Sequence, residues 1–83
     1  MLQQVNATIN GQQYTLEVEP EFYNGHKVYY ILNDDIEHMF HHLVPDHLVL
    51  METDTGFACS PKLEEMESGY IVQQIWRAIK ATC

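Results

Sequence analysis

The first part of the chain alternates between apolar and polar residues with a period of two. The apolar positions are Val5, Ala7, Ile9, Tyr14, Leu16 and Val18. A period of two is that of a β-strand with one buried face. Asn10 and Gly11, which separate the two runs, tolerate the positive φ angles of a type I′ turn, and that turn matches the twist of paired strands. The pattern therefore predicts a β-hairpin over residues 3–19.

Further strands are expected along the next part of the chain. Pro20 cannot donate a hydrogen bond to a neighbouring strand, so we expect it to end the second strand. A second Asn-Gly pair, at 24–25, marks another tight turn. Residues 27–32 are apolar or aromatic on both faces, which favours a strand covered on both sides or an inner strand of the sheet. Residues 47–52 predict a fourth strand and residues 57–59 a short fifth.

Between the third and fourth expected strands, apolar residues recur at intervals of three and four. They are Ile36, Met39, Phe40, Leu43 and Val44. This spacing is that of one helical face, and residues 33–35 offer candidate N-caps. We therefore predict a helix over residues 35–44, ended by Pro45. A strand is the alternative, but its alternation would leave Met39 and Leu43 on the solvent side.

After residue 60, the apolar residues lie on two nearly opposite faces of a helix. One face holds Leu63, Met66 and Tyr70, and the other holds Ile71, Val72, Ile75, Trp76 and Ile79. One straight helix would have to bury both faces. We therefore expect a break at Ser68 and Gly69, since serine can cap a helix and glycine tolerates a bend. The prediction is a turn or loop over 61–67 and a main helix over about 69–81.

The order of these elements predicts an α+β fold. We expect an antiparallel-rich sheet of four to five strands, a C-terminal helix packed on one face, and a shorter helix near residues 35–44. Trp76 and Ile79 are the expected main contacts of the C-terminal helix with the sheet. At 83 residues, the chain is expected to form one domain over residues 1–83.

The charge of the chain limits its partners. The formal net charge is −8, from four basic and twelve acidic residues. A nucleic-acid-binding protein concentrates basic residues on one surface, whereas Lys27, Lys62, Arg77 and Lys80 are scattered. An anionic membrane surface would repel the chain, and no apolar stretch approaches the ~20 residues of a transmembrane helix. Cys59 and Cys83 form no CxxC pair and no signal peptide begins the sequence, so a cytoplasmic location is expected.

A cluster of histidines is the main candidate for chemistry. His38, His41 and His42 would lie at helical spacings of three and four residues, at which imidazoles can bind one metal ion. These three are the candidate ligands of zinc or another transition metal, with His47 near in sequence. The segment lacks the HExxH order of a metalloprotease. The alternatives are solvent-exposed or interface histidines and a pH-sensitive contact, and we expect His38 and His42 to face solvent.

Other candidate chemistry is sparse, and no catalytic or cofactor-binding residue is predicted. Cys59 and Ser60 match no known nucleophile motif. Tyr23 and Tyr29 are expected to be exposed and to form a binding patch. We therefore expect a non-enzymatic protein-interaction or accessory module with an unknown protein partner, or a homodimer. The alternatives are a metal-binding module that uses the histidine cluster and a small enzyme of unknown reaction.

Overall fold

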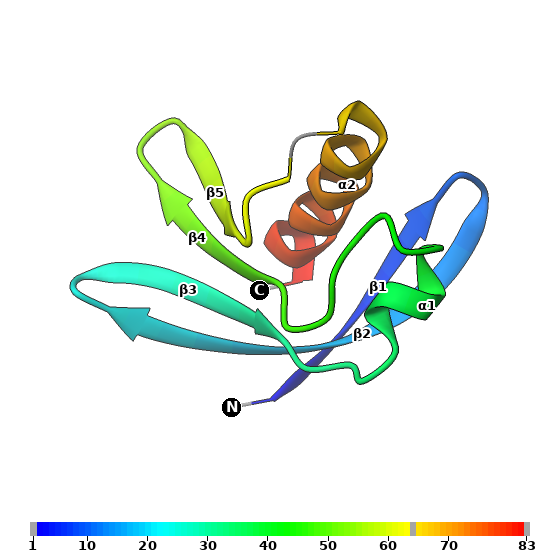
Figure 1. Ribbon diagram of the computed structural model, residues 1–83. Coiled ribbons are helices and arrows are strands. Elements are labelled where there is room, and N and C mark those ends of the chain that lie inside the picture. Colours follow the sequence, from blue (N-terminus) through cyan, green and yellow to red (C-terminus); the bar gives the residue numbers. More distant parts are fainter. Residues whose placement is uncertain (1, 64, 83) are drawn as a thin grey trace.

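The computed structural model describes residues 2–63 and 65–82, so that Cys83 lies outside the described residues. The elements are β1 (Gln3–Ile9), β2 (Gln12–Tyr23), β3 (His26–Ile31), α1 (Ile36–Met39), β4 (Val49–Thr53), β5 (Gly56–Ser60) and α2 (Met66–Thr82). The strands form one antiparallel sheet in the order β1-β2-β3-β4-β5. The long helix α2 packs on one face of this sheet and contacts β1 (Figure 1). The predicted α+β class is confirmed.

Both Asn-Gly pairs form tight hairpin turns. Asn10 and Gly11 have φ angles of 52° and 80°, and Asn24 and Gly25 have the same values. Two successive positive φ angles define the type I′ turn, in which asparagine and glycine meet the least steric resistance. The first turn joins β1 to β2 and the second joins β2 to β3, so the predicted hairpin is confirmed.

The expectation that Pro20 ends the second strand is wrong, because β2 continues to Tyr23. Glu17 accepts a hydrogen bond from Leu32 across the β2–β3 pair, which sets the alternation of bonded and non-bonded positions. Pro20, opposite Tyr29, falls at a non-bonded position, where an amide would point away from β3. On that side β1 has already ended, since its pairing with β2 reaches only Val18. Proline is tolerated at such an edge position.

The hydrophobic core lies between α2 and the sheet, and the loop around α1 closes it. Its members from the sheet include Val5, Ala7, Ile9, Leu16, Val18, Tyr29, Ile31 and Leu50, and those from α2 are Ile71, Val72, Ile75 and Ile79. Ile79 is fully buried, as expected, whereas Trp76 is half-buried and stacks on Phe57 with ring centroids 5.1 Å apart. The predicted exposure of Tyr29 is wrong, because its side chain is 0% exposed.

The hydroxyl of Tyr29 gives a first prediction. This buried oxygen has no hydrogen-bond partner among the described residues, while the ring packs edge-on against Trp76 at 5.6 Å between centroids. A buried hydroxyl without a partner loses its bonds to water on folding. Tyr29→Phe is therefore expected to raise the free energy of unfolding by about 1 kcal/mol in urea denaturation. A loss of stability would show that the hydroxyl is hydrogen-bonded in the native protein.

The first helix is shorter than the predicted 35–44, because α1 ends at Met39. His41 and His42 follow with φ angles of 54° and 67°, in the left-handed region that a right-handed helix cannot include. The apolar spacing still predicts burial correctly, since Ile36, Phe40 and Val44 all lie in the core. Residues 40–48 form a loop instead of the second half of a helix.

The expected break at Ser68 and Gly69 is wrong, because α2 runs through both residues from Met66. Ser68 is buried and continues the stripe of α2 that faces the sheet, and the amide of Gly69 donates to the Glu65 carbonyl at 3.0 Å. The opposite face of α2 is not packed against another element at Met66, whose side chain is 92% exposed. One helix therefore suffices, with a single buried face.

Gly69 therefore occupies the interior of a helix. Its φ is not positive, and an added Cβ would meet no atom within 4 Å. Alanine loses less backbone entropy than glycine on folding, so Gly69→Ala is expected to stabilise the protein by up to about 1 kcal/mol. Thermal and urea denaturation measure this change. A lower stability of the variant would mean that the helix is interrupted at this residue.

Candidate functional site

The structure places the predicted metal ligands on the surface around α1. His38 lies within α1, while His41 and His42 lie in the loop that follows, and all three are exposed. The predicted solvent exposure of His38 and His42 is confirmed. Their predicted helical spacing is wrong, because the helix ends between them. His47, also exposed, has a φ of 63° near the end of the same loop.

The nearest partner of the histidine loop is a carboxylate. His42 Nδ1 lies 2.8 Å from Glu37 Oε1, and both side chains are substantially exposed. The backbone amide of Glu37 donates to Asp46 Oδ1 at 2.9 Å, which ties the two ends of the segment together. Within the described ranges, no group of three or more His, Cys, Asp and Glu side chains could hold a metal ion. The zinc site formed by His38, His41 and His42 stays a prediction.

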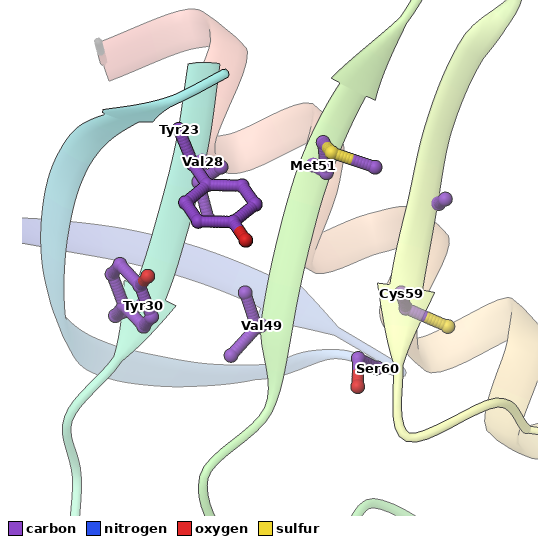
Figure 2. A pocket seen from close by; sticks show the side chains of 8 residues that line it. Tyr23, Val28, Tyr30, Val49, Met51, Cys59 and Ser60 are labelled. Carbon is purple, nitrogen blue, oxygen red and sulfur yellow. The ribbon is translucent and has the colours of Figure 1, made fainter. Parts of the chain in front are cut away.

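A different surface gathers apolar side chains, on the face of the sheet opposite α2. Val28 pairs with Met51 and Tyr30 pairs with Val49 across the β3–β4 ladder. Successive strand residues point to opposite faces, so these four lie on the face away from Tyr29 and the core. Figure 2 shows their side chains together on one side of the sheet, with the helix behind it.

These side chains line a hollow of about 250 Å³ that opens to solvent. Its lining residues are Tyr23, Val28, Tyr30, Val49, Met51, Ala58, Cys59 and Ser60. Tyr23 is 63% exposed, so its predicted exposure is confirmed. Its ring lies over Val28 on the open side of the sheet (Figure 2). We call Tyr23, Val28, Tyr30, Val49 and Met51 the open-face patch.

The chemistry that the open-face patch offers is mainly apolar contact. Val28, Val49 and Met51 contribute hydrocarbon and a thioether, and the tyrosines add aromatic surface with a hydroxyl at the tip. Thioether and aromatic side chains adapt to varied apolar partners. The arrangement therefore offers a surface for apolar contact.

The sequence carried a signal for this patch, in the third strand. Residues 27–32 are apolar or aromatic on both faces, which predicted a strand covered on both sides or an inner strand of the sheet. The structure makes β3 an inner strand, and α2 covers only the face that holds Tyr29 and Ile31. On the other face Tyr30 is only half-buried. The described residues thus leave one apolar face of β3 without a covering layer.

In comparisons with protein-family models, with curated proteins and with solved structures, nothing matches this chain. No helix in the described part of the chain is long and apolar enough to cross a membrane.

Proposed function

We propose that this protein is a non-enzymatic interaction module that docks a partner protein on the open-face patch. The observation that carries the proposal is the apolar face of β3 and β4 opposite α2, where Tyr30, Val49 and Met51 stay half-buried beside a hollow. Each Å² of apolar surface that is buried away from water contributes about 25 cal/mol of favourable free energy. A contiguous apolar patch therefore favours association. Large contiguous apolar patches that stay exposed mark interaction sites in soluble proteins.

Other occupants fit the patch less well. The hollow, at about 250 Å³, is smaller than the ~300–1,000 Å³ typical of small-molecule sites. Nucleic acid would be repelled by a chain of net charge −8, and the same charge opposes a homodimer. We further propose a cytoplasmic location, since two cysteines are too few for a disulfide framework.

Co-purification from cells that make the protein natively tests this proposal. Met51→Lys puts a charge into the patch without branching the side chain, and Thr8→Lys puts the same charge on β1, where Thr8 is exposed. The partner is expected with the wild type and with Thr8→Lys, and its yield should fall at least about tenfold with Met51→Lys. Circular dichroism and thermal unfolding check that both variants stay folded.

The proposal is wrong if folded Met51→Lys retains the same partners as the wild type. Sedimentation equilibrium of the purified protein distinguishes self-association. A dimer that dissociates in Met51→Lys but not in Thr8→Lys would make a second copy the occupant of the patch.

A further inference from the structure

A row of glutamates lies directly beside the open-face patch. Glu17, Glu19 and Glu21 alternate along β2 and therefore share one face of the sheet. Glu19 pairs with Tyr30 and Glu21 pairs with Val28, so this face is the one that carries the patch. We call the three carboxylates the glutamate row. An apolar strip over β3 and β4 is thus bordered along one side by negative charge.

Among residues 2–63 and 65–82, no lysine or arginine forms an ion pair with the glutamate row. Lys27 lies over the ring of Tyr29, 5.5 Å from its centroid, on the core side of the sheet. Arg77 and Lys80 belong to α2, and Lys62 lies between β5 and α2. The ion pairs among the described residues join His42 to Glu37 and Lys80 to Glu52, and they do not involve the row. A ligand of this face therefore meets a row of carboxylates with which no described lysine or arginine pairs.

The dimensions of this surface match a helix laid along the strands. Alternate residues of a strand lie about 6.8 Å apart, and helical residues four apart rise about 6 Å, so three cations at i, i+4 and i+8 can follow three glutamates. Neighbouring strands are about 4.8 Å apart. A helix about 10–12 Å wide, centred between β3 and β4, therefore brings one flank to within about 2 Å of the line of β2, where a lysine or arginine side chain can reach the glutamates.

We propose that the partner of the open-face patch is a basic amphipathic helix. Its apolar face seats over Tyr30, Val49 and Met51, and lysines or arginines along one flank lie against the glutamate row. This inference rests on the proposed docking function and names the partner's chemistry. A second copy of this chain is a poor occupant, since it brings a further net charge of −8.

Synthetic peptides test the proposal on the full-length protein. The probe is a 15-residue helical peptide with leucines at i, i+3, i+4 and i+7 and lysines along one flank. Its match is a control peptide in which glutamate replaces each lysine. In ¹⁵N-resolved spectra, the lysine peptide should shift the amides of Tyr30 and Met51 and bind at least about tenfold more tightly than its match. The peptide should also gain helical circular dichroism on binding.

Two triple variants that remove the same charge distinguish binding to the glutamate row from general attraction to a negatively charged protein. Changing all three residues of the glutamate row to glutamine should lower the affinity for the lysine peptide about tenfold. Changing Asp34→Asn, Glu65→Gln and Glu67→Gln removes the same charge from exposed positions outside this face and should have little effect. Equal weakening by both triple variants, or binding without a gain of helix, would overturn the basic-helix proposal.

The results also distinguish this inference from the docking function. If both peptides bind equally and Met51→Lys abolishes both, the patch docks apolar segments without regard to charge, and only the basic-helix proposal fails. If the lysine peptide binds but leaves Tyr30 and Met51 unshifted, the helix does not seat on the patch and the proposal is likewise overturned. The co-purification with Met51→Lys then decides the docking function on its own.

Discussion

Replacing Ile75 with alanine is expected to lower the free energy of unfolding by about 3–4 kcal/mol. Ile75 is 0% exposed and lies in the stripe of α2 that faces the sheet, within the core. The substitution removes apolar contacts and leaves a cavity that a closely packed core cannot fill without moving its neighbours. Urea denaturation measures the loss.

Gln73→Ala is the matched control, because Gln73 is exposed on the same helix. It should change the free energy of unfolding by less than about 0.5 kcal/mol. If Ile75→Ala costs as little as this control, α2 does not pack on the sheet through the face described above.

Gly11→Val is expected to destabilise the protein by about 2–3 kcal/mol. Gly11 has a φ of 80° in the β1–β2 turn, and an added Cβ would meet no atom within 4 Å. The cost therefore comes from backbone strain in a β-branched residue at positive φ and not from a steric clash with neighbours. Thermal and chemical denaturation measure it.

Gly11→Asn is the control for this prediction, since asparagine tolerates positive φ better than other non-glycine residues. It should cost under about 1 kcal/mol. Equal effects of valine and asparagine would mean that residue 11 does not need a left-handed backbone.

Local patterns predicted the sheet well, because hairpin chemistry acts over a few residues. Asn10 and Gly11 fix both the turn and the register that places Val5 and Leu16 on one face. The same logic held at the 24–25 turn. It failed at Pro20, because whether a proline is tolerated depends on where β1 ends, which the sequence around Pro20 does not contain.

The helices show the limit of periodicity. The spacing of Ile36, Phe40 and Val44 correctly predicted burial, but left-handed residues at 41 and 42 turn the chain into a loop that buries the same side chains. In the C-terminal segment, the expected break depended on the premise that Met66 is buried. The helix leaves it in solvent, so no break was required.

The candidate site could be predicted only in part. The two apolar faces of residues 27–32 predicted a strand covered on both sides or an inner strand of the sheet. Tyr23 was separately expected to be exposed in a binding patch. Which face α2 covers depends on pairing between distant segments, so the sequence could not show that Tyr29 is buried while Tyr30 lines an open hollow. The position of the glutamate row beside the patch also depends on this register.

Site-specific photo-crosslinking in the native cell tests the docking surface most directly. A photoreactive residue at Ala58, which lines the hollow and is exposed, should give a discrete adduct with another protein. The same residue at Thr8, on the polar part of the same face, should not, and adding Met51→Lys to the Ala58 probe should abolish the adduct. Adducts of equal yield from both positions, or an adduct from Ala58 that survives Met51→Lys, would contradict docking on the open-face patch.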